Sequence, residues 1–301
     1  MHVFVTGATG WIGSAVVDEL LGAGHEVTGL ARSDAAALAL GKKGARVRRG
    51  DLDDLDGLRD GALDAQAVVH LANKHDWGNP AESNRAERAA VETLAEALVG
   101  SGRPFALAAG LSGLVRGRPA TEADVSPEVG PDSHRGGAEN LALEYAEKGV
   151  RVLSVRFAPS VHGPGDHGFL AAITAVARKH GVSAYPGDGT TAWSAVARPA
   201  AAELVRLGIE SAPAGSRLHA VAEEAVTARE IAEAVGRTLD VPVVSLAPEL
   251  VDGHFGFVGR FFALDMTASS TRTRELLGWT PSGPGLVEDI EAGAYLGKGK
   301  S

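Results

Sequence analysis

Residues 3–21 read Val-Phe-Val-Thr-Gly-Ala-Thr-Gly-Trp-Ile-Gly-Ser-Ala-Val-Val-Asp-Glu-Leu-Leu, and this stretch decides the fold. Its first three residues are β-branched or aromatic, which predicts a short buried strand. From Ile12 onward the apolar residues follow helical spacing, which predicts a helix that ends near Gly22. A tight turn from Thr6 to Gly10 connects the strand to the helix.

Three glycines give this turn the pattern G-x-x-G-x-x-G. Gly7 permits the turn, Gly10 lets backbone N–H groups approach a pyrophosphate, and Gly13 lets the helix lie close to the strand. The free N–H groups and the positive end of the helix dipole would then hold the phosphates. An ordinary strand–helix turn is the alternative, but the position between a strand and a helix favours a dinucleotide site. The predicted contacts in this turn are Gly7, Thr9, Gly10, Trp11, Ile12 and Gly13.

The composition is that of a globular protein and excludes several classes of function. The chain has 301 residues, a formal net charge of −9 and no cysteine. An acidic chain lacks the basic face that nucleic acid requires, and without cysteine there is no disulfide, thiolate nucleophile or Cys-ligated metal. No apolar run is long enough to span a bilayer, and the first strand begins too early to leave room for a signal peptide. We therefore expect a cytoplasmic protein.

The end of the second strand predicts which dinucleotide is bound. Residues 25–30 form that strand, and NAD sites place an acidic residue near its end to bind the ribose hydroxyls. Here Ala31 takes that position, and Arg32 and Ser33 supply a guanidinium and a hydroxyl. Because an arginine–phosphate contact is charge-assisted, these residues favour NADP(H). The alternative is that Arg32 is a solvated loop residue.

Strands and helices alternate through the first half of the chain. This order, with a phosphate-binding turn first, predicts an α/β fold with a Rossmann-type doubly wound parallel sheet. The expected strands after the second are 45–49, 67–72, 105–109 and 150–157, and the expected helices are 84–99 and 135–147.

Single polar residues follow or interrupt these strands. Asp51 follows the third strand, where it either meets the adenine or caps the next helix. His70 lies inside the apolar fourth strand, so we expect a packed core histidine. Asn73 follows the carboxyl end of that strand and is expected to line a ligand crevice.

The character of the sequence changes after Phe157. A loop rich in glycine and proline carries His162, Asp166 and His167, which suggests either a metal site or, preferably, a loop that lines the substrate pocket. We expect helices at 169–180 and 269–277, a strand at 218–222, and a capping-box helix start at Thr227-Ala-Arg-Glu230. The predicted division is a nucleotide-binding domain, 1–157, and a smaller mixed substrate lobe, 158–301, partly woven back onto the sheet.

The chain resembles the extended short-chain dehydrogenases/reductases, of the NAD(P)-dependent epimerase/dehydratase and 3β-hydroxysteroid dehydrogenase-like kind. The matching segments are TGATGWIG (6–13), GDL (50–52), VVHLA (68–72), RFAPSVHGPGD (156–166), GDG (187–189) and ELLGWTP (275–281). The resemblance implies further cofactor contacts at Asp51, Leu52, Leu71, Ala72, Asn73, Ala158 and Pro159.

In that family a Ser or Thr after the fifth strand binds the substrate oxygen, and a Tyr-x-x-x-Lys on the next helix transfers a proton and holds the nicotinamide ribose. Ser112 matches the serine, and Ser133 is a lesser candidate. Arg135 matches the lysine and Glu139 a glutamate four residues later, so the tyrosine position falls on Pro131 or nearby. No Tyr-x-x-x-Lys occurs in the sequence.

The missing tyrosine leaves the proton donor open. Arginine can bind ribose hydroxyls but does not exchange protons near neutral pH, whereas histidine does. The candidate catalytic residues are therefore Ser112, Arg135 and a histidine, either His134 or His162, with His167 as a further candidate donor. A second departure is Ala192-Trp-Ser-Ala-Val-Ala-Arg-Pro-Ala-Ala, where the family commonly has a polar V-x-D element; it suggests an altered substrate pocket.

These residues favour an atypical NADP-dependent oxidoreductase that reduces a carbonyl or an activated double bond of a small metabolite. Two alternatives are an epimerase, dehydratase or lyase on the same scaffold, and an NADP-sensing binding protein without turnover. The expected partner is a small-molecule substrate, with no metal, nucleic acid or membrane, and the expected state is a monomer or a homodimer.

Overall fold

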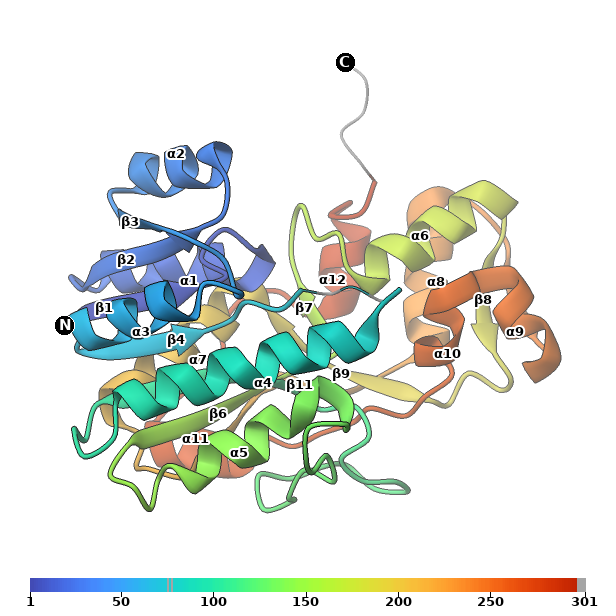
Figure 1. Ribbon diagram of the computed structural model, residues 1–301. Helices are drawn as coiled ribbons and strands as arrows, with labels where there is room; N and C mark the ends of the chain where they lie inside the picture. The colour runs from blue at the N-terminus through green and yellow to red at the C-terminus, as the bar shows by residue number, and fades with distance from the viewer. Residues whose placement is uncertain (75, 77, 297–301) are drawn as a thin grey trace.

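A seven-stranded parallel sheet forms the centre of the protein, shown by a computed structural model that describes residues 1–74, 76 and 78–296 (Figure 1). The strand order is β10-β6-β5-β4-β1-β2-β3, which confirms the predicted doubly wound α/β fold. The strands are β1 (His2–Thr6), β2 (Glu26–Ala31), β3 (Arg46–Arg49), β4 (Ala67–His70), β5 (Pro104–Gly110), β6 (Arg151–Phe157) and β10 (Ser216–Ala220).

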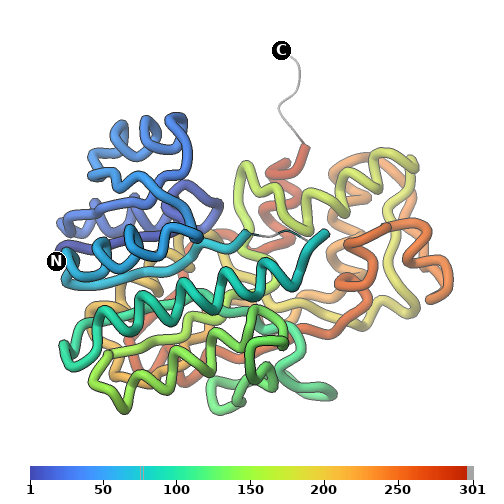
Figure 2. The backbone as a smooth tube through the Cα atoms, in the orientation of Figure 1, coloured from blue at the N-terminus to red at the C-terminus, as the bar shows by residue number. Residues whose placement is uncertain are grey.

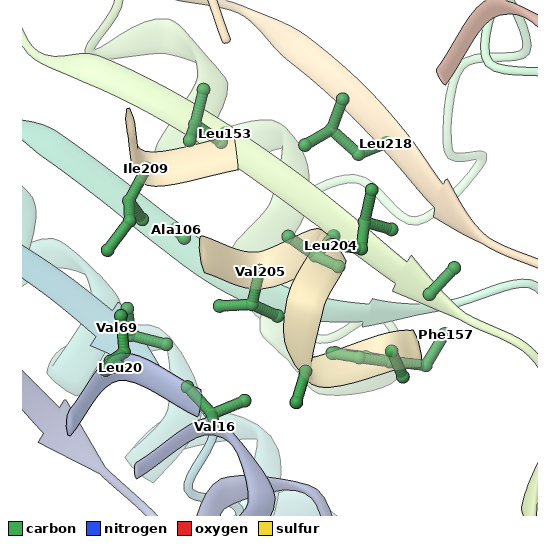
Figure 3. Close-up of a cluster of buried hydrophobic side chains, with 14 of the residues drawn as sticks. Val16, Leu20, Val69, Ala106, Leu153, Phe157, Leu204, Val205, Ile209 and Leu218 are labelled. Carbon is green, nitrogen blue, oxygen red and sulfur yellow. The ribbon is translucent and has the colours of Figure 1, made fainter. Parts of the chain in front are cut away.

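Helices cover both faces of this sheet. One face packs against α1 (Trp11–Gly22), α2 (Asp34–Lys43) and α7 (Arg198–Ser211), and the other against α3 (Leu55–Asp64), α4 (Pro80–Ala97) and α5 (Ala138–Glu144). A sheet buried on both faces needs nearly continuous apolar strands, as β1 and β4 have. The core between α1, α7 and the sheet is labelled in Figure 3: Val16, Leu20, Val69, Ala106, Leu153, Phe157, Leu204, Val205, Ile209 and Leu218.

A smaller lobe follows, at the right of Figure 1, around its own apolar cluster. Strands β11, β9 and β7 form a three-stranded sheet in that order, and β12 pairs with β8. Its strands are β7 (Ser160–His162), β8 (Ser183–Pro186), β9 (Ala192–Ala197), β11 (Glu223–Thr227) and β12 (Val243–Leu246). Its helices are α6 (Phe169–His180), α8 (Ala228–Leu239), α9 (Pro248–Phe255), α10 (Gly259–Phe262) and α12 (Leu286–Glu291); α11 (Thr271–Leu277) lies against β10 and α7.

Part of the chain beyond residue 157 packs against the first lobe again. After β9 it returns to the large sheet, where α7 packs on α1 and β10 pairs in parallel with β6. Figure 2 lets the reader follow this return, in yellow and orange, behind the sheet. An edge strand of the large sheet therefore comes from beyond residue 157.

Several predicted elements are confirmed and others need correction. The Thr227–Glu230 capping box begins α8, and Gly278 ends α11 in left-handed backbone. The helix expected from residue 84 begins earlier, at Pro80, because Asn79 caps it. The helix expected over 135–147 spans Ala138–Glu144, preceded by a 3-10 turn at His134–Gly137.

Of two polar residues in the first lobe, one lacks a role that was expected as an alternative and the other is placed as expected. Asp51 does not cap the helix that follows β3, because Asp54 is the N-cap of α3 and accepts the Gly57 N–H at 3.0 Å. His70 is fully buried, as expected. The segment expected to be a loop around His162 contains β7 instead, because three of its residues pair with β9.

Candidate active site

The turn before α1 has the close packing that its glycines predict. Gly7 lies at φ +66°, and a Cβ there would come 2.7 Å from the backbone of Ala72; a Cβ on Gly13 would come 2.0 Å from the carbonyl oxygen of Gly7. Within the described residues the backbone N–H groups of Trp11, Ile12 and Gly13 have no acceptor, and no acidic residue occupies the first turn of α1. Free N–H groups at a helix start suit a pyrophosphate.

The Trp11 side chain connects this turn to the second lobe. Its indole N–H donates to the Val161 carbonyl at 2.7 Å, the Arg198 guanidinium lies 4.1 Å above its ring, and His167 meets it edge-on. Arg198 also donates to the Ser14 hydroxyl of α1. The position of the turn before α1 is thus fixed from two elements beyond residue 157, β7 and α7.

The segment expected near the adenosine ribose follows β2 on the surface. Arg32 is exposed, and among the described residues it forms no hydrogen bond or ion pair. Ser33 is the N-cap of α2, where its hydroxyl accepts the Ala36 N–H at 3.2 Å. Arg49, at the end of β3, donates to the Ser33 carbonyl and to Asp34. The guanidiniums of Arg32 and Arg49 therefore lie at this end of the sheet, and among the described residues that of Arg32 has no hydrogen-bond partner.

The remaining predicted cofactor contacts follow the carboxyl ends of other strands. Asp51 accepts the Asp53 N–H at 2.9 Å and is exposed, and Leu52 is buried. Leu71 and Ala72 follow β4 and donate to the Thr6 backbone and hydroxyl respectively, each at 3.3 Å. The other two residues of this set, Ala158 and Pro159, follow β6.

A cavity of about 320 Å³ lies at the carboxyl ends of β4 and β5. It brings together four predicted site residues, Ser112, His134, Arg135 and Asn73, together with Glu139. Its walls include Ala108, Ala109, Gly110, Leu114, Pro127 and Phe169. Among the described lining residues, Phe169 is the only one from beyond residue 157, so the first lobe builds most of this cavity.

Beneath the cavity lies a buried carboxylate that sequence reasoning missed. Glu87 of α4 is 1 % exposed; its Oε1 accepts from Arg135 Nη2 at 2.5 Å, and its Oε2 accepts from Asn73 at 2.9 Å. The His70 ring lies 4.0 Å away, and burial lowers the pKa of that histidine, opposed by the Glu87 charge. The sequence did contain one indication: Glu87 lies four and seven residues before the apolar residues Val91 and Leu94, and therefore on the same face of the helix.

Arg135 itself is held in an uncommon backbone conformation. Its φ is +53°, a region that non-glycine residues rarely adopt. Its N–H donates to the Asn84 side chain at 2.9 Å, and its guanidinium reaches Glu87, so two contacts to α4 hold it there. A guanidinium has five N–H donors, and several therefore remain for a ligand.

The two candidate histidines occupy different environments. His134 is exposed, lines the cavity and donates its backbone N–H to Glu128 at 2.9 Å. His162 is fully buried and does not line it; its Nδ1 lies 2.5 Å from Asp289 of α12. The nearby Asp166 accepts from the Tyr295 hydroxyl at 2.9 Å. The structure therefore does not bring His162 to the cavity.

The three tyrosines of the sequence, Tyr145, Tyr185 and Tyr295, do not line the cavity. Burial, the largest cause, and nearby carboxylates raise the pKa of both Tyr145 and Tyr295. The place that the resemblance assigns to a tyrosine, Pro131, is exposed. Within the described chain no tyrosine hydroxyl is available to the cavity.

Glu139 borders the cavity and belongs to a second polar cluster that sequence reasoning did not find. Its Oε1 accepts from Ser154 and from Arg156 Nε, each at 2.7 Å. Arg156 is fully buried and also donates to the Asp124 carbonyl at 2.8 Å. The Arg156 guanidinium therefore offsets the charge of Glu139, the member of this cluster that lines the cavity.

Comparison with known proteins agrees with this architecture. The model of the NAD dependent epimerase/dehydratase family matches residues 3–196. An uncharacterized protein of Schizosaccharomyces pombe is 41% identical over 98% of this chain and 100% of its own length, and one of Saccharomyces cerevisiae is 42% identical over the same shares.

Solved structures show the same fold. A UDP-glucose 4-epimerase of Thermus thermophilus in complex with NAD aligns with a TM-score of 0.75 at 23% identity, covering 99% of this chain and 100% of its own. A dTDP-glucose 4,6-dehydratase of Streptomyces venezuelae with NAD bound aligns with a TM-score of 0.78 at 20% identity, covering 98% and 96%. The chain belongs to the NAD-dependent epimerase/dehydratase family, the family that its sequence motifs resemble.

Proposed function

We propose that the protein is an NADP-dependent oxidoreductase that acts on a carbonyl group or an activated double bond of a small metabolite. The observation that carries this proposal is the cavity that Ser112 and Arg135 share at the carboxyl ends of β4 and β5. In a doubly wound sheet this edge is where ligands bind. The glycine turn before α1 opens at the same edge, with three free N–H groups.

The residues present suit a nicotinamide dinucleotide. A Cβ at Gly7 or Gly13 would fill the space that the close turn requires. When bound, the cofactor exchanges a hydride with the substrate. Arg135 would hold the ribose hydroxyls with the N–H donors that Glu87 leaves free. Arg32 supports NADP, because its guanidinium is uncommitted among the described residues and follows β2.

At the substrate, the Ser112 hydroxyl would donate a hydrogen bond to the reacting oxygen. In a carbonyl reduction that oxygen also gains one proton. Among the described residues, His134 is the histidine that lines the cavity, so we assign the proton to His134 or to a water molecule that it orients. We do not assign it to His162, which is buried against Asp289.

The family membership keeps an epimerase or dehydratase as the second candidate, because the same cavity would serve a reaction in which the hydride returns to the substrate. An oxidoreductase consumes NADPH with each turnover, whereas an epimerase or dehydratase consumes no net cofactor. We assign residues 1–157 to the cofactor and 158–301 to the lobe that closes over the substrate, with α7 and β10 returned to the sheet.

The test is a screen of ketones and enones that follows NADPH absorbance, with product analysis in parallel. We expect stoichiometric NADPH loss with an accepted substrate. Replacement of Ser112 with Ala, or of His134 with Phe, should lower turnover by about 10²–10⁴-fold with NADPH affinity nearly unchanged. Product formed without net NADPH loss would instead support the epimerase or dehydratase.

A further inference from the structure

We propose that the cavity selects an uncharged carbonyl compound and rejects substrates that carry a carboxylate or phosphate. This inference rests on the proposed function and concerns the substrate of the same site. It follows from how the charged residues around the cavity are paired.

The two arginines at or next to the cavity are each paired with a carboxylate. Arg135 donates to the buried Glu87, and Arg156 of β6 donates to Glu139, which lines the cavity. Each pair sums to zero formal charge. A guanidinium bound to a buried carboxylate attracts a second anion less than a free one does.

Two carboxylates at the cavity have no such partner. Asp76 and Glu128 line it, and within the described part of the chain neither forms an ion pair. Backbone N–H groups fix their positions: Asp76 accepts from Gly78 at 2.9 Å and Asn79 at 3.2 Å, and Glu128 accepts from His134 at 2.9 Å. Among the described residues that line the cavity, the carboxylates Asp76, Glu128 and Glu139 outnumber the one guanidinium, Arg135. This excess of negative charge repels an anionic substrate.

The rest of the wall is apolar. Ala108, Ala109, Leu114, Pro127 and Phe169 present carbon surface to a cavity of about 320 Å³. Such a wall favours a compact hydrocarbon skeleton, with Ser112 available for one oxygen. A diphosphate would lose its hydration there and face Asp76 and Glu128 instead of unpaired arginines. The combination fits a small neutral ketone, aldehyde or enone.

The experiment uses pairs of ketones that differ by one carboxylate, such as acetophenone and 4-acetylbenzoate, together with UDP-glucose as a nucleotide-sugar probe. Binding to the protein with NADP⁺ present is measured by saturation-transfer NMR, and kcat/KM is measured from NADPH absorbance. We expect the neutral member to be preferred by about tenfold or more, and the preference to shrink as salt is added.

A double variant, Asp76→Asn with Glu128→Gln, should reduce the preference by about tenfold. Asp56→Asn on α3, an exposed residue paired with Arg59, is the matched control and should leave it unchanged. Urea unfolding verifies that the variants are folded.

The outcomes separate this inference from the proposed function. Neutral members that bind preferentially without NADPH oxidation would support the inference and refute the oxidoreductase. Carboxylated members or UDP-glucose that bind as well as the neutral ones would overturn the inference, whether or not NADPH is consumed. A preference unchanged in the double variant, or no binding by any member of the pairs, would overturn it as well.

Discussion

Arg135 and Glu87 face each other across 2.5 Å, a guanidinium from a loop in left-handed backbone and a carboxylate buried in α4. This pair occupies the place where the resemblance expects a lysine. The Glu87 carboxylate fixes the position of the Arg135 guanidinium, whereas a lysine at this position would carry its charge on a flexible side chain. Glu87 also accepts from Asn73, so two site residues, Arg135 and Asn73, depend on one carboxylate.

Removal of that carboxylate should weaken the fold and the site together. Glu87→Ala leaves the Arg135 guanidinium and the Asn73 amide without their acceptor, and we expect a loss of about 1–3 kcal/mol in the free energy of unfolding. Urea denaturation measures it. Arg85→Ala is the control, because its pair with Glu82 is exposed, and it should change stability by less than about 0.5 kcal/mol. Equal losses of unfolding free energy in the two variants would show that the buried pair contributes no more to stability than the exposed one.

Arg32 should determine the cofactor preference. If its guanidinium contacts the 2′-phosphate, NADP(H) should bind more tightly than NAD(H) by about 1.5–3 kcal/mol, and Arg32→Ala should remove that difference. Calorimetric titration of both cofactors measures it. Arg46→Ala, which removes an exposed arginine paired with Glu26 on the neighbouring strands, should leave the preference intact. A wild-type protein with equal affinities would refute the role of Arg32.

Gly13 should tolerate no side chain. A Cβ there would lie 2.0 Å from the Gly7 carbonyl oxygen, whereas a Cβ at Gly22 of the same helix meets nothing within 4 Å. Gly13→Ala should therefore displace the turn, lower stability by about 2 kcal/mol or more and abolish dinucleotide binding. Gly22→Ala should be neutral or stabilising by up to about 1 kcal/mol. Thermal unfolding and cofactor titration of both variants provide the test; a Gly13→Ala protein that binds normally would contradict the assignment.

Acid should destabilise the protein through its buried histidines. Burial lowers the pKa of His70 and of His219 below the usual 6.5. Below about pH 6.5 the unfolded chain binds protons that the folded chain does not, so stability falls as the pH decreases toward the folded pKa values. His70→Asn should flatten the dependence of the unfolding free energy on pH between about 5 and 7. His134→Asn, at an exposed site, should not. An unchanged slope in His70→Asn would be contrary to this expectation.

The sequence predicted the features that depend on residues close together along the chain. The turn before α1 could be predicted because its three glycines, the strand pattern before them and the helix pattern after them lie within about twenty residues. The sequence predicted that part of residues 158–301 returns to the sheet, but not that α7 does so, because Arg198-Pro-Ala-Ala carries no signal for the surface that it covers. The short strand β7 was missed for the same reason: its residues pair with residues of β9 that lie 35 positions further along the chain.

The candidate site divides in the same way. The family resemblance pointed to Ser112, in the loop after β5, and to Arg135, four residues before Glu139, and the structure brings both to one cavity. Glu87 was missed because its partners come from 14 and 48 residues away, and only the fold places them together. His162 looked accessible in a loop rich in glycine and proline, yet its pairing with Asp289 joins it to the last helix. The proton donor stays a prediction.

The return of the chain to the large sheet has a consequence for how the protein is made. Strand β6 has no outer neighbour until residues 216–220 have been synthesised, and the apolar side of α1 has no cover until α7 exists. During that interval the nascent protein presents an open strand edge beside exposed aliphatic side chains, the combination that invites pairing with other chains. A ribosome-bound fragment ending near residue 157 should therefore depend on chaperones, while the complete chain covers the same surfaces with its own segments.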